Sequence, residues 1–204
     1  MAELDVQPKK SSPWIWILLA LIAIVILFFL LKGCNSKTAT VAATDSTITK
    51  TVAVTRPDWD KVDFNAAKTT DADVTDPAIA ISGNDQYTIY TLGENILFAT
   101  DQKDLQGTAG DRLKQIVASL NKRFKGASIG VYGSTDSTGT AGHNKMLGAE
   151  RAAAVKNWLV QTGGLDSTLV SIHSLGEIKP VATNATAGGR QQNRNVSIVA
   201  FPNK

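Results

Sequence analysis

The sequence predicts an α/β two-layer sandwich, with a mixed sheet and helices on one face, preceded by a single transmembrane helix and a flexible linker. Short apolar segments of alternating polarity recur within residues 85–204, and two amphipathic helical segments of similar length lie between them. Near the N-terminus, residues 13–31 contain no charged side chain. The folded elements are expected in the order strand, helix, strand, helix, strand, strand. In this order both helices can cover one face of a small sheet.

A transmembrane helix is predicted over residues 13–31, after a short polar N-terminus at residues 1–12. A helix of this length spans roughly 28 Å, close to the thickness of a bilayer core. Trp14 and Trp16 stand at its start, where indole rings favour the membrane interface. The apolar run is longer than that of a cleaved signal peptide. It also contains no ionisable residue, whereas a helix that conducts protons usually has one. We therefore expect an uncleaved signal anchor.

Cys34 is the only cysteine, so it cannot form a disulfide within the chain. The preceding residues, Leu-Lys-Gly, loosely resemble the cleavage box of a bacterial lipoprotein, although Lys32 fits that box poorly. An unmodified cysteine at a helix end is the favoured interpretation, and lipidation of Cys34 is the alternative. In both cases the chain is expected to be tethered to a membrane, either by the transmembrane helix or by the lipid.

Residues 32–84 are rich in Thr, Ala, Asp and Ser and show no sustained period, which predicts a flexible linker. As a coil, this length spans roughly 40 Å on average. Trp59 and Phe64 are isolated apolar points within it. We expect them to form a local docking patch on the folded domain, with a partner-binding motif as the alternative.

The first half of the domain begins with a strand at 87–92, because YTIYTL alternates in polarity. A turn at 93–101 follows, with a short apolar piece. A helix is predicted at 108–124 from an apolar stripe at spacings of three and four, with Gly126 as its stop. The next strand is expected at 127–132. Strands joined through a helix in this way are expected to run parallel.

The second half contains a helix at 144–161, which Gly163 and Gly164 end. A strand at 169–174 follows. A loop is predicted for 176–192, and the last strand at 195–201 places alternate apolar residues on one side.

The most informative stretch runs from the end of the second strand into the second helix. Asp136 comes just after the strand, where side chains reach a cleft rather than a core. Arg151 lies four residues after Leu147 and four before Val155, and therefore on the apolar face of the helix. A guanidinium there needs an anionic partner or a ligand. Asp136 and Arg151 are expected to neutralise each other when the site is empty and to receive a small zwitterionic group. A purely structural ion pair is the alternative.

Residues 86–202 resemble the OmpA C-terminal-like domain, a peptidoglycan-binding module. No single motif is specific, but their order and spacing together support the resemblance. The pieces are LFATD at 97–101, GSTD at 133–136 with Gly139, then Asn144, Leu147, Arg151 and Ala152, then Gly176, Glu177 and Pro180, and finally Gly189, Arg190, Asn193 and Arg194.

The resemblance implies noncovalent binding of peptidoglycan without a metal or other cofactor. It implies that Asp136 and Arg151 grip the diaminopimelate of the peptide stem. The further pocket contacts implied by the family are Thr135, Thr138, Asn144, Arg194 and Asp101.

Three positions depart from the family pattern. Ser134 stands where the family usually has His, Gly148 stands where it has Ser, and Asn195 replaces an arginine. The last change removes a cation that was expected near the pocket rim, and none of the three removes the central pair.

The sequence therefore predicts a non-enzymatic protein of the bacterial cell envelope, held in a membrane through residues 13–31 with its C-terminal domain in the periplasm. A wall-anchoring subunit of a larger motor or secretion complex is the alternative, and a membrane protein partner or a homo-oligomer remains open. The basic residues are scattered, so nucleic acid is not an expected partner. A hydrolase built from Ser134, Asp136, His143 and His173 is disfavoured, because no nucleophile elbow is present.

Overall fold

The computed structural model describes Trp14 and residues 57–99, 102 and 104–202. The chain divides into two compact units, Met1–Ala53 and Val54–Lys204. In the first unit, Trp14 is helical and exposed. The predicted transmembrane segment at 13–31 otherwise lies outside the described residues, as does Cys34. Among the residues that are described, no helix has the length and apolar character needed to cross a bilayer.

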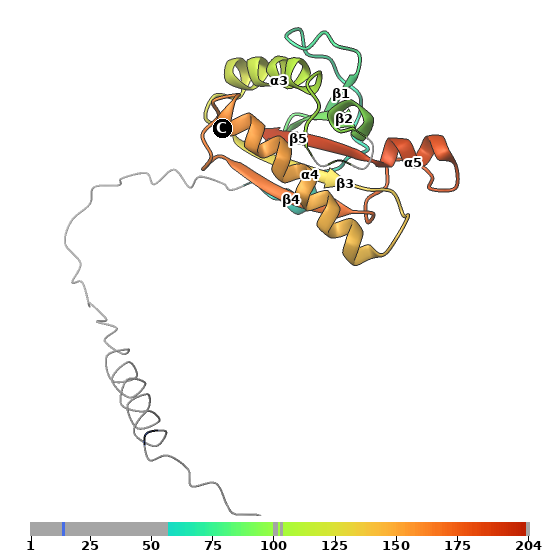
Figure 1. Ribbon diagram of the computed structural model, residues 1–204. Coiled ribbons are helices and arrows are strands. Elements are labelled where there is room, and N and C mark those ends of the chain that lie inside the picture. The colour runs from blue at the N-terminus through green and yellow to red at the C-terminus, as the bar shows by residue number, and fades with distance from the viewer. Residues whose placement is uncertain (1–13, 15–56, 100–101, 103, 203–204) are drawn as a thin grey trace, which may run out of the picture. The chain divides into compact units, whose positions relative to one another are not determined.

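The second unit is built on a five-stranded mixed sheet in the order β1-β2-β5-β3-β4 (Figure 1). The strands are β1 Ile79–Gly83, β2 Thr88–Gly93, β3 Ser128–Ser134, β4 Val170–Gly176 and β5 Asn195–Phe201. Only β3 and β4 pair in parallel; the other neighbours are antiparallel. Because β2 and β3 both run antiparallel to β5, they point in the same direction, as predicted, with β5 between them. The predicted mixed α/β sheet is confirmed.

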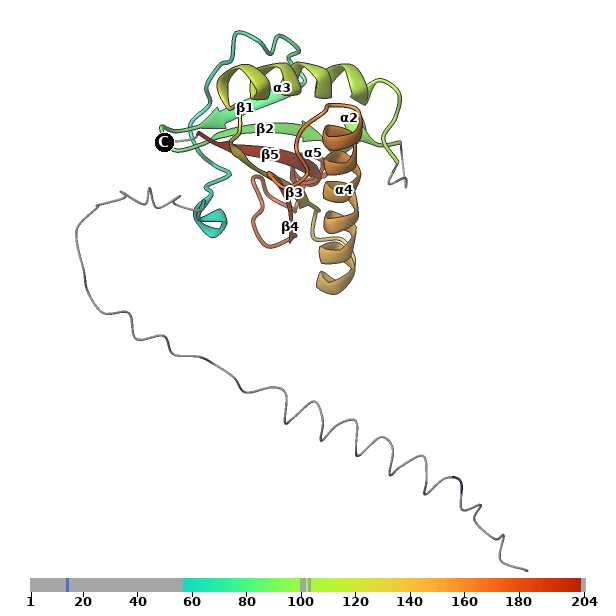
Figure 2. The ribbon, with the colours of Figure 1, turned by 90° about the vertical axis from the view of Figure 1, so that its left-hand side faces the viewer.

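Two long helices, α3 Ala109–Arg123 and α4 Ala141–Gln161, pack on the sheet (Figure 2). Tyr90, Val131 and Ile198, from three neighbouring strands, lie in one core with side chains of both helices. The helical contribution comes from residues that recur at spacings of three and four, namely Leu113, Ile116 and Leu120 of α3 and Ala152, Val155 and Leu159 of α4. The apolar stripes predicted from the sequence therefore build this core.

Two short helices fall where the sequence predicted a turn and a loop. They are α2 Glu94–Leu97 and α5 Ala187–Asn193. Each is too short to show a helical period. Thr186 starts α5 by accepting a hydrogen bond from the Gly189 backbone N–H at 3.1 Å.

The opposite face of the sheet is covered by the segment that leads into β1. Trp59, in the 3-10 helix η1 Trp59–Lys61, packs against His173 and edge-on against Phe201, both at 5.0 Å between ring centroids. Phe64 packs edge-on against Tyr132. The predicted docking patch is therefore confirmed. The predicted linker boundary at residue 84 differs from the structure, because β1 and the covering segment belong to the fold.

A buried carboxylate joins this N-terminal segment to α3. Asp71 Oδ2 accepts hydrogen bonds from Tyr90 Oη at 2.8 Å, Ser119 Oγ at 2.5 Å and Arg123 Nη1 at 2.6 Å. The Asp71 side chain is only 1% exposed. Its burial raises the pKa, but the hydrogen bonds from Ser119, the Asp73 backbone, Tyr90 and Arg123 outweigh that effect and lower the pKa of Asp71 to about 2.

Replacing this carboxylate is expected to destabilise the domain. Asp71→Asn should lower the free energy of unfolding by about 3 kcal/mol at pH 7, because it leaves Arg123 and two hydroxyls without their anionic acceptor. A depressed pKa contributes stability that is present above the unfolded-state value and is lost as pH falls toward the folded-state value. The difference from the wild type should therefore shrink between pH 5 and pH 2, as measured by urea unfolding.

Asp73→Asn is the matched control, because Asp73 lies two residues away and its pair with Lys122 is partly exposed. Its effect should stay below about 1 kcal/mol. An Asp71→Asn penalty that is equally large at pH 7 and at pH 2 would contradict this account.

Candidate ligand-binding site at the carboxyl end of β3

The candidate site is organised by a close approach between β3 and α4. A Cβ atom on Gly133 would lie 1.8 Å from the Gly148 carbonyl oxygen, and one on Gly148 would lie 2.7 Å from that of Gly133. Only glycine at both positions lets the two backbones meet in this way. Asp136 follows Gly133 by three residues, and Arg151 follows Gly148 by three. The contact therefore fixes the loop that carries Asp136 against the face of α4 that carries Arg151.

Asp136 is held as a carboxylate at the end of β3. Its side chain is 10% exposed. Oδ1 accepts the Thr138 backbone N–H at 2.8 Å, and Oδ2 accepts Arg194 Nη1 at 2.5 Å. Burial acts to raise the pKa of Asp136, but the hydrogen bonds from Thr138 and Arg194 are stronger and leave the pKa below its ordinary value.

Arg151 is buried on the inner face of α4, as predicted, with its side chain 6% exposed. Its Nη2 donates to Glu94 Oε1, and its guanidinium lies 5.9 Å from the ring centroid of Phe98. The other Glu94 oxygen lies 2.8 Å from Arg194 Nε. The four charged groups thus form one chain of contacts, from Asp136 through Arg194 and Glu94 to Arg151.

The expected mutual neutralisation of Asp136 and Arg151 requires correction, because Arg194 and Glu94 take part in it. Arg194 contacts both carboxylates, and Glu94 contacts both arginines. The physical reason is that two carboxylates and two guanidinium groups meet at this end of the sheet. Each buried charge then has an opposite neighbour.

Asn144 fixes the loop from within the first turn of α4. The residue is 2% exposed, and its Nδ2 lies 3.0 Å from the Thr138 carbonyl oxygen and 3.2 Å from that of Asp136. The same nitrogen donates to Glu177 Oε2 at 2.5 Å. Asn144 therefore positions the Asp136 loop and ties it to the end of β4.

The two threonines of the predicted site differ in their surroundings. Thr138 is exposed. Thr135 is buried, and within the described part of the chain its Oγ1 has no hydrogen-bond partner. Thr135 directly precedes Asp136 in the sequence, and Thr138 follows it by two residues. Asp101, the remaining predicted contact, lies outside the described residues.

Asn193 holds a second loop beside the first. Its Oδ1 accepts the backbone N–H groups of Val181 and Ala182, each at 2.9 Å, and its Nδ2 donates to Asn184 Oδ1. Asn184 Oδ1 in turn accepts the Ser137 backbone N–H at 3.3 Å. The loop after β4 is thereby joined to the Asp136 loop.

The sequence predicted that Asn195, in place of an arginine, removes a cation near the pocket rim. In the structure Asn195 does not lie at an exposed rim. It is buried at the start of β5, and its Nδ2 donates to the Gln192 carbonyl oxygen at 2.8 Å. An asparagine here closes the turn out of α5 with its own hydrogen bonds.

Sequence reasoning missed Glu94 and named Glu177 only as part of a motif, without a role in the site. Glu94 directly follows β2, and Gly93 pairs with Asn195, so Glu94 arrives beside Arg194. Its backbone N–H donates to the Arg194 carbonyl oxygen at 2.9 Å. The available signal was an acidic residue at a strand end, but that signal has meaning only once β2 and β5 are known to pair.

The residues of the disfavoured hydrolase do not assemble. His173 is hydrogen-bonded through Nε2 to Ser171 Oγ at 2.8 Å and stacks on Tyr132. Its burial lowers its pKa. Within residues 57–99 and 104–202, no hydrogen bond joins His173 or His143 to Ser134 or Asp136.

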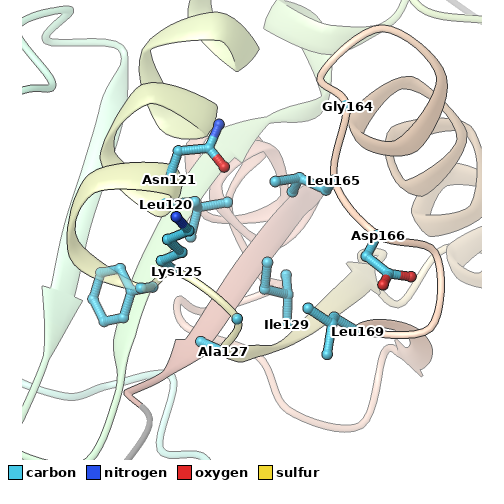
Figure 3. Close-up of a pocket in the computed structure, with 11 residues that line it drawn as sticks. Leu120, Asn121, Lys125, Ala127, Ile129, Gly164, Leu165, Asp166 and Leu169 are labelled. Atoms are coloured by element: carbon cyan, nitrogen blue, oxygen red, sulfur yellow. The ribbon is translucent and has the colours of Figure 1, made fainter.

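A separate cavity of about 160 Å³ lies at the start of β3 rather than at its end (Figure 3). Leu120, Ile129 and Leu169 give it apolar walls, and Lys125 and Asp166 stand at it as well. Asp136 follows the opposite end of the same strand, so this cavity is distinct from the charged site.

A model of the OmpA family matches residues 97–194. The chain is 36% identical over 115 residues to a peptidoglycan-associated lipoprotein of Mesorhizobium japonicum, covering 56% of this chain and 67% of that one. It is 36% identical over 107 residues to the peptidoglycan-binding protein ArfA of Mycobacterium tuberculosis, covering 52% and 32%. The chain spans little more than half, or less, of the length of several other curated relatives that it matches.

The fold also resembles a solved structure, the cell wall anchor of the T6SS from Pseudomonas aeruginosa. The TM-score is 0.56 at 28% identity, covering 61% of this chain and 88% of that chain. The family model covers residues 97–194, and the relative from Mesorhizobium japonicum is 36% identical and covered over 67% of its own length. The chain therefore belongs to the OmpA family.

Proposed function

We propose that this chain binds peptidoglycan noncovalently through the diaminopimelate of the peptide stem and so tethers a bacterial membrane to the cell wall. One relative is named as peptidoglycan-associated and another as peptidoglycan-binding. The observation that carries the proposal is the partly buried chain of contacts from Asp136 to Arg151 at the carboxyl end of β3. No covalent step is needed, so the chain acts as a binding protein rather than an enzyme.

The chemistry of the ligand suits this site. The free end of diaminopimelate carries a carboxylate and an ammonium on one carbon. The planar Arg151 guanidinium can donate two hydrogen bonds to the carboxylate, while Asp136 accepts the ammonium. The Asp136, Glu94, Arg151 and Arg194 charges sum to zero. A zwitterion adds no net charge, so the buried site stays balanced when the ligand enters.

The remaining parts of the proposed tether precede the domain. Residues 13–31 anchor the chain in the membrane, with lipid attachment at Cys34 as the alternative. Since the fold begins by residue 57, residues 32–56 form the connection. They reach about 85 Å at full extension, and their coil average is roughly 30 Å. The domain lies in the periplasm in this arrangement.

The alternative function is a wall-anchoring subunit within a larger envelope complex. The similarity to the cell wall anchor of the T6SS favours it. In that case the same site holds the wall, and the membrane segment contacts partner helices. Co-purification of membrane proteins with the full chain, lost when residues 13–31 are exchanged for an unrelated apolar helix, would distinguish the two functions.

The central pair can be tested by retention on the wall. Asp136→Ala and Arg151→Ala in the detergent-purified full chain should each weaken co-sedimentation with insoluble diaminopimelate-type peptidoglycan by about ten- to a hundredfold, since each removes charge-assisted hydrogen bonds. Arg112→Ala is the matched control and should leave retention unchanged, because Arg112 of α3 pairs with Asp76, away from the site. Undiminished retention of both site variants, with thermal unfolding showing folded protein, would defeat the assignment.

The ligand chemistry predicts a preference between wall types. A stem with lysine in place of diaminopimelate keeps an ammonium but loses the carboxylate that Arg151 would receive. The full chain should therefore sediment with diaminopimelate-type peptidoglycan and be retained at least tenfold less by lysine-type peptidoglycan, given the strength of a charged hydrogen bond. Equal retention on both would show that the stem carboxylate is not what the site recognises.

A further inference from the structure

Glu94 contacts the guanidinium that would receive the proposed ligand's carboxylate. Its carboxylate reaches Arg151 through Oε1 and lies 2.8 Å from Arg194 Nε through Oε2. One acidic side chain thus engages both arginines of the site. It is delivered from α2, an element separate from the Asp136 loop, and its side chain is 16% exposed, so solvent still reaches it.

We propose that Glu94 competes with the ligand for Arg151, an inference that rests on the proposed function. The Glu94 carboxylate must leave Arg151 before the ligand's carboxylate can bind there. The guanidinium presents a fixed fork of donors, and the edge that faces Glu94 Oε1 is already used. A second carboxylate on the same edge would bring two like charges together in a largely desolvated place, which is costly. Binding is therefore an exchange of one carboxylate for another.

The structure gives the displaced carboxylate a place to go. Glu94 Oε2 is buried near Arg194 Nε but lacks hydrogen-bond geometry to any described group. A small shift of Glu94 away from Arg151 and toward Arg194 can improve this contact, so the displaced charge is not stranded. Asp136 keeps its hydrogen bond from the Thr138 N–H while it accepts the ligand's ammonium.

Such an exchange sets the selectivity of the site. A ligand that brings only an ammonium cannot replace Glu94 on Arg151, so it gains only the contact with Asp136. A ligand that brings both charges recovers the ion pair that it breaks. The consequence is weaker but more selective binding than an empty guanidinium would give, because every binding event must offset the loss of the Glu94–Arg151 contact.

The test is the affinity of the full chain for soluble meso-diaminopimelate, measured by calorimetry in detergent. Glu94→Gln keeps the size of the side chain and removes its charge, so it should bind about tenfold more tightly than the wild type. Glu150→Gln is the matched control, because it removes the same charge beside Arg151 but from the exposed side of α4. It should leave the affinity unchanged.

The double variant Glu94→Gln/Arg151→Ala tests whether the increase in affinity depends on Arg151. If it does, the double variant should lose that increase. Weaker or unchanged binding by folded Glu94→Gln would overturn the competition and make Glu94 a positioning residue for Arg151. If the wild type binds neither diaminopimelate nor peptidoglycan, the proposed function itself fails. If the wild type binds and Arg151→Ala abolishes binding, but Glu94→Gln does not improve it, only the competition by Glu94 is contradicted. The proposed function then stands.

Discussion

The buried guanidinium of Arg151 is the constraint on which the site depends. A charge on the inner face of a helix is tolerated only when opposite charge is brought to it, and here that charge arrives from a different strand end. Glu94 comes from the end of β2, Arg194 from the start of β5 and Asp136 from the end of β3. Three strand ends must therefore be adjacent for the helix to dock, which links the order of the sheet to the chemistry of the site.

The contact between Gly133 and Gly148 makes this docking possible. Because neither residue has a side chain, α4 lies directly against the end of β3. The loop that follows is then stabilised by hydrogen bonds rather than by apolar packing, with Asn144 and Asn193 as the buried amides that hold it. Rigid backbone on both sides keeps the acidic and basic groups in place with little reorganisation, which favours recognition of a small ligand.

The segment that leads into β1 packs on a different part of the domain. The chain enters through Trp59 on the outer face of the sheet, runs past the buried Asp71 carboxylate and joins the sheet edge as β1. Trp59 adds apolar contact, and Asp71 adds hydrogen bonds to α3. In the proposed tether, tension would arrive through this segment, on a different part of the fold from the charged site. Tension would then act on the contacts of the N-terminal segment, while the ligand would bind to the charged site.

The sequence by itself determined the long helices, four of the five strands and the burial of Arg151, because apolar periodicity over ten or more residues reports directly on which face is covered. It also singled out Asp136, and the family resemblance added Asn144 and Arg194; the structure brings all three to one place. Only the tertiary structure decided that residues 57–83 belong to the fold, since their few apolar side chains have no local period and become meaningful when they cover a sheet face. The same holds for Glu94: one acidic residue after a strand has no visible partner until antiparallel pairing of β2 with β5 sets it between two arginines.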